Sequence, residues 1–306
     1  MKVLIVGLGS IARKHISALN ALYEQTELYA WRSSAESEVE SGIEDLFTWE
    51  QVSEHTFDFT IISNPTAQHR NTISQLSQLG IPMFIEKPLF EKTGDGEQQL
   101  VERIQSLGVW TYVACNLRFL ACVRYIKDKI SGQTINEVNV YCGSYLPDWR
   151  PGKDFRRNYS ANEEQGGGVH IDLIHELDYL FWLFGTPQQS DALFTRNSSL
   201  HISAFDYANY RWQYDTFTAA IILNYYRRDA QRSLEIVCEK GTYKVDLLKN
   251  QVSFAGNIVF LSDQRIGDTY TEQMQFFVEH LKSGTRPGFN SVSEAYKILN
   301  LCLHQS

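Results

Sequence analysis

Up to about Asn116, short apolar runs alternate with longer stretches in which apolar residues recur at helical spacing. The apolar runs predict strands at Val3–Val6, Glu27–Trp31, Phe57–Ser63, Pro82–Ile85 and Val109–Ala114. The stretches between them predict helices at Ser10–Tyr23, Ala67–Leu79 and Gly94–Leu107. Strands and helices that alternate in this way predict an α/β domain with a doubly wound parallel sheet. A ligand is then expected at the carboxyl ends of the strands.

The pattern changes after about Asn116. Helices are predicted at Phe119–Ile130, Val169–Phe184 and Ser291–His304, and strands at Glu137–Gly143, Thr216–Tyr226, Ser233–Glu239 and Thr242–Leu248. Apolar and polar residues alternate in the last two strands, and Glu239–Thr242 between them reads as a hairpin turn. We therefore expect an α+β domain with an open, mainly antiparallel sheet. Its open face needs cover, which favours a homodimer or homotetramer formed through this sheet.

Composition narrows the class of protein without changing this picture. The chain has 306 residues, of which 43% are hydrophobic and 21% charged, as expected for a globular protein of two domains, here 1–117 and 118–306. A formal net charge of −8 argues against a nucleic-acid partner. No apolar run is long enough to span a membrane or to act as a signal peptide. The five cysteines lack metal-binding or redox spacing, so we expect reduced thiols, no metal and a cytoplasmic location.

The first predicted strand runs directly into the motif Gly7-x-Gly9-x-x-Ala12. Gly7 permits a tight turn, Gly9 lets a pyrophosphate approach the bare backbone, and Ala12 lets the following helix pack close to the strand. Ser10 and Ile11 open that helix, whose free N–H groups and positive dipole end favour phosphate. These residues predict a dinucleotide site, and an ordinary strand–turn–helix is the alternative.

The end of the second strand indicates which dinucleotide is bound. Sites selective for NAD usually place Asp or Glu here, whereas this chain has Trp31-Arg32-Ser33. Arg32 and Ser33 together could hold a 2′-phosphate through charge-assisted hydrogen bonds. We therefore expect NADP(H) to be favoured over NAD(H). The alternative is a solvated Arg32 beside a packing Trp31.

Polar residues follow the third strand. Asn64, Pro65, Thr66 and His69 would line the cofactor channel at the carboxyl edge of the sheet. A simpler interpretation is that Asn64-Pro65 makes a turn and Thr66 caps the next helix. The two interpretations are compatible.

Glu86-Lys87-Pro88 ends the fourth strand. A lysine at this point faces the crevice where a nicotinamide would lie. An ammonium group there can polarise a substrate oxygen or exchange a proton with it. Glu86 and Lys87 are accordingly predicted to line the cofactor site, with Lys87 as a catalytic residue. A surface Glu-Lys pair is the alternative that this position argues against.

Three glycines, Gly166–Gly168, precede a predicted helix that carries Asp172, His175 and Asp178. Glycines allow the backbone to pass very close to a ligand. Spacing of three residues places the two carboxylates and the imidazole on one helix face. Carboxylates on both sides of His175 would orient it for proton exchange near neutral pH. The alternatives are buried polar groups that are merely satisfied, and His170 as a weaker candidate.

Together with Asn116-Leu117-Arg118-Phe119, these motifs resemble those of the glucose–fructose oxidoreductase/inositol dehydrogenase (Gfo/Idh/MocA) family. The resemblance implies a Rossmann domain followed by a domain with a large open sheet and helices on one face. It also implies NAD(P)-dependent oxidation or reduction of a sugar or cyclitol hydroxyl. Lys87, Asp172 and His175 would line the catalytic site, with Asn116 and Arg118 near the substrate.

One feature departs from the common family pattern. Asp172 and His175 are three positions apart, whereas the family usually has four. The run Asp-Leu-x-His-Glu-x-Asp is similar to a subgroup found in bacterial surface-sugar gene clusters. This departure leaves open whether His175 or Lys87 is the principal acid and base.

The stretch from Ser144 to Gln165 is rich in aromatic and basic residues. Its candidate substrate ligands are Tyr145, Trp149, Arg150, Arg156 and Tyr159. Aromatic faces suit sugar rings, and arginines suit phosphate or carboxylate groups. We read the stretch as a recognition loop for a nucleotide-linked or acidic sugar. An exposed or dimer-contacting loop is the alternative.

The sequence therefore predicts hydride transfer between a nicotinamide and a sugar carbon. His175 would exchange the hydroxyl proton, while Lys87 would stabilise the developing oxyanion or share the proton role. Two other functions fit the same fold. One is a regulator that binds the dinucleotide without catalysis. The other is a redox-assisted glycosidase or epimerase, in which the nicotinamide is oxidised and reduced within each turnover.

Overall fold

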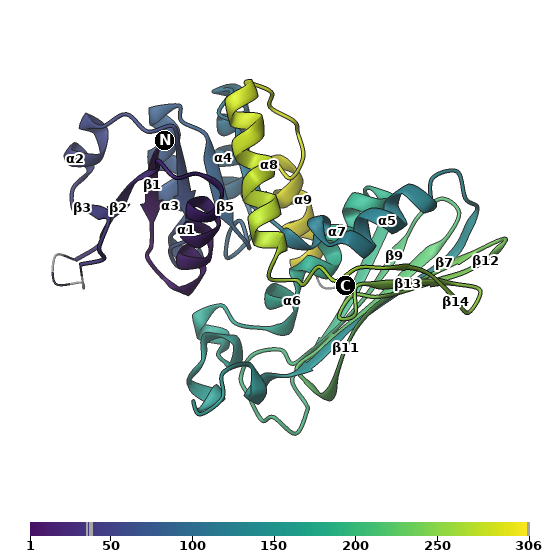
Figure 1. The fold of residues 1–306 in the computed structure, drawn as a ribbon. Coiled ribbons are helices and arrows are strands. Elements are labelled where there is room, and N and C mark those ends of the chain that lie inside the picture. The colour runs from purple at the N-terminus through teal and green to yellow at the C-terminus, as the bar shows by residue number, and fades with distance from the viewer. Residues whose placement is uncertain (35, 37–38, 305–306) are drawn as a thin grey trace. The chain divides into compact units, whose positions relative to one another are not determined.

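The computed structural model describes residues 1–34, 36 and 39–304 (Figure 1). The chain divides into two compact units. Met1–Cys115 and Tyr270–Leu299 form the first unit, and Asn116–Thr269 with the residues from Asn300 onward forms the second. Within the described residues, no helix is both long enough and apolar enough to cross a lipid bilayer.

The first unit is built on a parallel sheet in the order β3-β2-β1-β4-β5-β6. The strands are β1 (Lys2–Val6), β2 (Glu27–Trp31), β3 (Ile43–Leu46), β4 (Phe59–Ile62), β5 (Met83–Glu86) and β6 (Thr111–Ala114). The strand order reverses between β1 and β4, where a doubly wound sheet opens a crevice for its ligand. The predicted parallel sheet is confirmed. Only β3 was missed, because its sequence Ile-Glu-Asp-Leu is half charged.

Helices cover this sheet. They are α1 (Ser10–Leu22), α2 (Trp49–Glu54), α3 (Thr66–Leu76), α4 (Asp95–Ser106), α8 (Thr269–Ser283) and α9 (Val292–Leu303). α1 buries Ala12, His15, Ala18 and Leu19 along one face, at the spacing expected of an amphipathic helix. A 3-10 turn at Ser77–Leu79 continues α3.

α8 shows where the end of the chain packs. The ring of Phe277 is fully buried, and its centroid lies 4.5 Å from Trp110, 5.1 Å from Phe59 and 5.4 Å from Phe84. Tyr270–Leu299 therefore groups with the first unit, whereas the sequence assigned everything from residue 118 onward to the second domain. No local motif marks this return of the chain, and α8 itself was not predicted.

The second unit contains an eight-stranded sheet in the order β14-β13-β12-β11-β7-β10-β9-β8. The strands are β7 (Ile135–Tyr145), β8 (Gln189–Thr195), β9 (Tyr207–Gln213), β10 (Thr218–Asn224), β11 (Tyr226–Cys238), β12 (Gly241–Asp246), β13 (Gln251–Phe254) and β14 (Asn257–Leu261). Only β7 and β10 pair in parallel. The predicted open, mainly antiparallel sheet is confirmed.

One face of this sheet is buried and the other is open. Val138, Ile221 and Leu234 are fully buried beneath the helices α5 (Ala121–Lys129), α6 (Val169–Asp172) and α7 (Ile174–Phe184), which Figure 1 shows on one side of the strands. Glu137 and Thr218 are exposed on the opposite face. Assembly of two or four copies through that open face stays a prediction.

Short 3-10 turns make up much of the connection from β7 to α6. They lie at Leu146–Trp149, Phe155–Arg157, Tyr159–Ala161 and Glu163–Gln165, and a further one at Asn116–Phe119 precedes α5. The predicted recognition loop is therefore an ordered chain of turns, which fixes the directions of its side chains.

The packing of Phe277 predicts a large loss of stability on truncation. Phe277→Ala would leave a cavity among Phe59, Phe84 and Trp110, and it should lower the free energy of unfolding by about 3–5 kcal/mol. Urea denaturation followed by tryptophan fluorescence measures the change. Val259→Ala, on the exposed strand β14, is the control and should cost less than about 0.5 kcal/mol. Similar values for the two variants would contradict this packing.

Candidate functional site

The turn between β1 and α1 has the geometry of a phosphate-binding loop. Gly7 has φ +89°, and a Cβ added there would lie 2.6 Å from the backbone of Asn64, so only glycine fits. A Cβ on Gly9 would meet nothing within 4 Å. Gly9 is the N-cap of α1, where no side chain caps the helix and the first turn carries no acid. The uncapped N–H groups at Ser10 and Ile11 thus fit a pyrophosphate, as predicted for this motif.

Arg32 is not solvated. Its Nη1 lies 3.1 Å from Oδ1 of Asp45, and the two side chains are only 11% and 13% exposed. Asp45 lies on β3, the strand that was not predicted, and pairs in register with Ala30 of β2. A carboxylate therefore stands near the dinucleotide-selecting end of β2, where the sequence indicated none. Ser33 is exposed beside this pair.

His69 ties two loops together. The side chain is buried, and its Nδ1 lies 3.1 Å from the carbonyl oxygens of both Pro88 and Leu89. Its Nε2 lies 3.0 Å from the carbonyl oxygen of Asn64. Burial lowers the pKa of His69, which favours the neutral ring. The imidazole has almost no exposed surface, and contact of His69 with a cofactor stays a prediction.

The other residues after β4 have mixed roles. Asn64 is half-buried and donates from Nδ2 to the hydroxyl of Thr72 at 2.9 Å. Pro65 is the N-cap of α3, with no side-chain hydrogen bond, and Thr66 is the first helical residue. The predicted cap by Thr66 is therefore wrong. The expected turn at Asn64-Pro65 does precede the helix.

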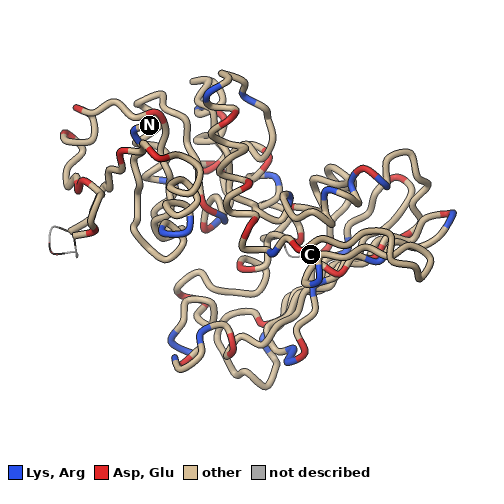
Figure 2. The backbone as a smooth tube through the Cα atoms, viewed as in Figure 1, with Lys and Arg blue, Asp and Glu red and all other residues tan. Residues whose placement is uncertain are grey.

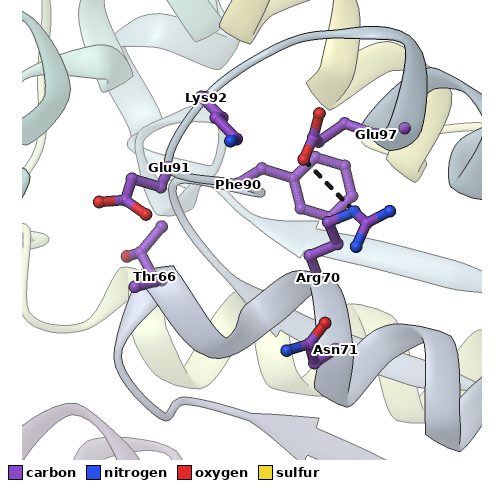
Figure 3. Close-up of a pocket in the computed structure, with 9 residues that line it drawn as sticks. Thr66, Arg70, Asn71, Phe90, Glu91, Lys92 and Glu97 are labelled. Carbon is purple, nitrogen blue, oxygen red and sulfur yellow. Dashed lines mark ion pairs between the residues drawn. The ribbon is translucent and has the colours of Figure 1, made fainter.

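A cavity of about 460 Å³ lies beside these residues in the first unit (Figure 3). It is lined by Thr66, Ala67, Arg70, Asn71, Phe90, Glu91, Lys92, Gly96 and Glu97. Arg70 and the buried Glu97 form an ion pair across it, with Nε 3.3 Å from Oε1. Basic and acidic side chains are balanced around this cavity, so its charge favours neither an anion nor a cation.

Lys87 follows β5 directly and is half-buried. Glu86, the last residue of the strand, is buried and points toward α1, where its Oε1 lies 2.5 Å from Nε2 of His15. The side chain of Glu86 is thus engaged by His15, and a role of this residue at the cofactor site stays a prediction.

In the second unit, Asp172 lies at the centre of a hydrogen-bonded cluster. Its Oδ1 accepts from the hydroxyl of Tyr159 at 2.7 Å, and its Oδ2 accepts from the hydroxyl of Tyr225 at 2.5 Å. Burial and the nearby carboxylate raise the pKa of both tyrosines, so the hydroxyls keep their protons at neutral pH. Tyr225 was missed from the sequence because it lies 53 residues from Asp172, immediately after β10.

The predicted single helix around His175 is interrupted. α6 ends at Asp172, Leu173 has φ −99° and ψ 25°, and α7 begins at Ile174, so His175 lies in the first turn of a separate helix. His175 itself is half-buried. His175 and Asp178 share α7, as the spacing predicts, whereas Asp172 lies before the break and outside that helix.

Asp178 and Arg118 form a buried ion pair. Arg118 donates from Nε and Nη2 to the two oxygens of Asp178 at 2.8 and 2.7 Å, and the side chains are 0% and 1% exposed. Asn116 is also buried, and its Nδ2 donates to the hydroxyl of Thr269 at 2.7 Å. Both side chains are almost fully enclosed, and the substrate contacts of Arg118 and Asn116 stay predictions. Asp178 holds Arg118, a role that the sequence did not indicate.

The glycine run packs against the chain itself. A Cβ on Gly167 would lie 1.9 Å from the carbonyl oxygen of Tyr159, and Gly168, with φ +146°, lies against the ring of His170. The ring of His170 stacks on Phe194 at 4.8 Å. Burial lowers the pKa of His170 to about 4, so the ring is neutral and unsuited to proton exchange near neutral pH.

The recognition loop brings aromatic side chains to Asp172. Trp149 meets the ring of Tyr225 edge-on at 5.3 Å and donates from Nε1 to Ser144 Oγ at 2.9 Å. Trp149 and Tyr159 are 38% and 42% exposed. Together with Asp172 and Tyr225, these two residues form what we call the aromatic cluster. Its exposed ring faces, next to a carboxylate, suit a polyhydroxylated ligand.

The basic residues of this loop are partly engaged by its own polar groups. Arg150 donates to Asn158, and Arg156 lies over the ring of Phe155 at 4.5 Å. The hydroxyl of Tyr145 accepts from Arg228 at 3.0 Å. Figure 2 shows basic and acidic positions interspersed in this part of the second unit. The described part of the loop therefore has no continuous positively charged surface, although exposed guanidinium groups such as that of Arg156 are present.

Comparison with known proteins finds a matching family model within each of the two units. Residues 1–115 match the family model described as an oxidoreductase family with an NAD-binding Rossmann fold. Residues 123–244 match the model of the GFO/IDH/MocA C-terminal domain. The chain belongs to the Gfo/Idh/MocA family of oxidoreductases.

Relatives in this family share low sequence identity with the chain. Myo-inositol 2-dehydrogenase of Thermotoga maritima is 21% identical, with 94% of this chain and 90% of the relative aligned. The 2,7-anhydro-N-acetylneuraminate hydratase of Mediterraneibacter gnavus is 27% identical over 48% of this chain and 37% of its own. A structure of UDP-N-acetylglucosamine 3-dehydrogenase from Acidithiobacillus ferrooxidans is 18% identical, with a TM-score of 0.81 and coverage of 100% of this chain and 96% of that one. These likenesses show the Gfo/Idh/MocA fold.

Substitution by alanine should have different effects at Gly7 and at Gly9. Gly7→Ala would clash with the backbone of Asn64 and strain φ, so it should lower both the melting temperature and the affinity for NAD(P)H. Gly9→Ala meets open space, so it should leave the melting temperature unchanged and lower NAD(P)H affinity about 10-fold or more, by blocking the approach to α1. Thermal denaturation and fluorescence titration measure the two effects. Unchanged affinity in Gly9→Ala would contradict this site.

The buried His170 should make stability depend on pH. Its pKa is about 4 in the folded chain and near 6.5 when unfolded, so the unfolded state binds a proton first as pH falls. Its contribution to stability should therefore be lost between about pH 6.5 and pH 4, to a total of about 3 kcal/mol. His170→Phe keeps the stacking on Phe194 and should flatten the pH dependence of denaturation by that amount. Identical profiles for the wild type and the variant would show that His170 is accessible to protons in the fold.

Proposed function

We propose that this protein is an NAD(P)-dependent oxidoreductase that interconverts a hydroxyl and a keto carbon of a sugar. The observation that carries the proposal lies at the carboxyl edge of the parallel sheet. The uncapped end of α1 follows β1, and Lys87 follows β5. Only β4 separates these strands, so their ends are about 10 Å apart. That separation suits a dinucleotide whose pyrophosphate rests on α1 and whose nicotinamide reaches Lys87.

The chain would supply charge stabilisation and proton exchange. When bound, the nicotinamide provides the site that gives or takes the hydride. We propose that the ammonium group of Lys87 stabilises negative charge on the substrate oxygen. His175 would exchange the hydroxyl proton, and Asp172, held by two tyrosine hydroxyls, would complete the polar surroundings.

We further propose that the aromatic cluster recognises the sugar ring. Trp149 and Tyr159 present ring faces beside Asp172, a combination that can bind the apolar face and the hydroxyl groups of a pyranose. Arg150 and Arg156 lie on the same loop and could contact a carboxylate or phosphate of a nucleotide-linked or acidic sugar. The likeness to a UDP-N-acetylglucosamine 3-dehydrogenase is in keeping with that substrate class.

For the cofactor, we propose NADP(H) as the preferred dinucleotide. Arg32 and Ser33 at the end of β2 would hold the 2′-phosphate. Asp45 acts against this preference, since it neutralises part of the charge of Arg32. The opposing charges of Arg32 and Asp45 would together decide the selectivity between NADP(H) and NAD(H).

A second function is supported by one of the relatives. The relative from Mediterraneibacter gnavus is a hydratase, and hydration is a reaction without net oxidation. If this chain also uses its nicotinamide transiently, product would form while the absorbance of the reduced cofactor stays constant. A screen of free and nucleotide-linked sugars that follows both absorbance and product by mass spectrometry separates the two functions.

Lys87→Ala should abolish turnover while leaving dinucleotide affinity within about threefold of the wild type, because the variant loses transition-state stabilisation and retains the phosphate contacts. The rate should fall by about 100-fold or more. Lys92→Ala, which removes an exposed lysine from the separate cavity, is the matched control and should keep full activity. Near-normal turnover in Lys87→Ala would remove this mechanism.

The proposed cofactor preference can be tested by binding. Arg32→Ala should weaken NADPH about 10-fold or more and leave NADH within about threefold, because only NADPH carries the 2′-phosphate. Asp45→Asn frees the charge of Arg32 and should shift the affinity ratio further toward NADPH. Isothermal titration with each dinucleotide measures the ratio. A wild-type preference for NADH that Arg32→Ala does not alter would contradict the NADP(H) proposal.

A further inference from the structure

His15 and Glu86 form a buried pair between α1 and β5, within the first unit. Nε2 of His15 lies 2.5 Å from Oε1 of Glu86, and the side chains are 0% and 9% exposed. His15 lies about one and a half turns after the uncapped start of α1, and Glu86 immediately precedes Lys87. The pair therefore joins the helix that would bind the pyrophosphate to the strand that carries the proposed catalytic lysine.

The surroundings of His15 determine which ring nitrogen carries the proton. Nδ1 is buried and has no hydrogen-bond partner among the described residues. A doubly protonated ring would leave an N–H unpaired in an apolar site, which is costly. The neutral tautomer with hydrogen on Nε2 avoids this cost, because it donates its only proton to Glu86. Glu86 is then the acceptor of the hydrogen bond from His15.

The second oxygen of Glu86 acts on the backbone of Lys87. Oε2 accepts from the Lys87 N–H at 3.1 Å. The carboxylate thus bridges the His15 ring and the peptide nitrogen of Lys87. With one oxygen fixed by His15, the other can hold this N–H in one position, which limits rotation of the backbone from which the lysine side chain extends.

We propose that His15 is a positioning residue for Lys87, acting through Glu86. This inference rests on the proposed function, in which the Lys87 ammonium group must lie within reach of a substrate oxygen. A displacement of about 1 Å in a catalytic group can lower the rate about 100-fold. Loss of the His15 hydrogen bond should therefore reduce turnover although His15 lies within the core.

The other groups packed around the pair do not replace it. The ring of Phe84 meets His15 edge-on at 4.8 Å, and the ring of Tyr270 lies at 5.9 Å. The ammonium group of Lys14 lies over Tyr270, 4.7 Å from its centroid. The ring of His69 hydrogen-bonds to carbonyl groups on the far side of Lys87. His15 is thus surrounded mainly by aromatic rings, and its ring hydrogen-bonds to Glu86.

Kinetics of matched variants test the proposal. His15→Phe keeps a ring of similar size without a donor, and His15→Gln places an amide N–H near the position of Nε2. We expect kcat to fall about 10- to 100-fold in His15→Phe, with dinucleotide affinity unchanged, and to recover in His15→Gln. In the Lys87→Ala background, His15→Phe should have no further effect, since it acts only through that lysine. Full turnover in a folded His15→Phe, or an additive double variant, would overturn the proposal.

A second measurement does not depend on finding the substrate. Reductive methylation with ¹³C-formaldehyde labels the lysines for NMR, and Lys87→Arg identifies the Lys87 signal. His15→Phe should shift or broaden that signal, and His15→Gln should restore it, while the signal of Lys92 stays unchanged. Leu19→Ala, a buried truncation elsewhere in α1, controls for general destabilisation and should not move it.

The outcomes separate the two claims. If Lys87→Ala retains turnover, the proposed function fails, whatever the His15 variants show. If Lys87→Ala loses turnover but His15→Phe leaves both the rate and the Lys87 signal unchanged, only the positioning role fails. A shift of the Lys87 signal that appears equally in Leu19→Ala also overturns it.

Discussion

The parallel register of β1, β4 and β5 is the constraint on which the first unit depends. It brings the carboxyl ends of three strands to one edge, so that Gly7, Asn64 and Lys87 become neighbours although they are far apart in sequence. The contact between Gly7 and the backbone of Asn64 leaves no room for a side chain, which fixes the direction in which α1 leaves the sheet. An uncapped helix start and a lysine at the same edge follow from this arrangement.

Several polar residues that seemed suited to ligand binding instead hold the fold. Arg118, for example, is fully enclosed with Asp178. Charges buried this deeply need partners, because an unpaired one would cost several kcal/mol. Lys87, Trp149 and Tyr159 are candidate residues whose side chains keep partial access to solvent. Residue type and position along the chain cannot distinguish a buried pair from an exposed ligand.

The sequence predicted the parallel sheet well, because continuous apolar runs followed by helical spacing have few alternatives. It also located Gly7 and Gly9, whose roles depend on local backbone geometry. It missed the partners that arrive from distant segments, namely Asp45 beside Arg32 and Tyr225 beside Asp172. It assigned the residues of α8 to the second domain, whereas the packing of Phe277 groups them with the first unit. The break at Leu173 was hidden by a helical pattern that continues through it.

Direct hydride transfer between the nicotinamide and a sugar carbon is the step on which the proposed function depends. The most direct measurement supplies NADPH and NADH that carry deuterium at the transferable C4 position, together with a keto-sugar accepted by the protein. Mass spectrometry then locates the label in the product. The account predicts one deuterium on the reduced sugar carbon, with oxidised dinucleotide formed in equal amount. Product without deuterium, or product formed with no change in the dinucleotide, would contradict it.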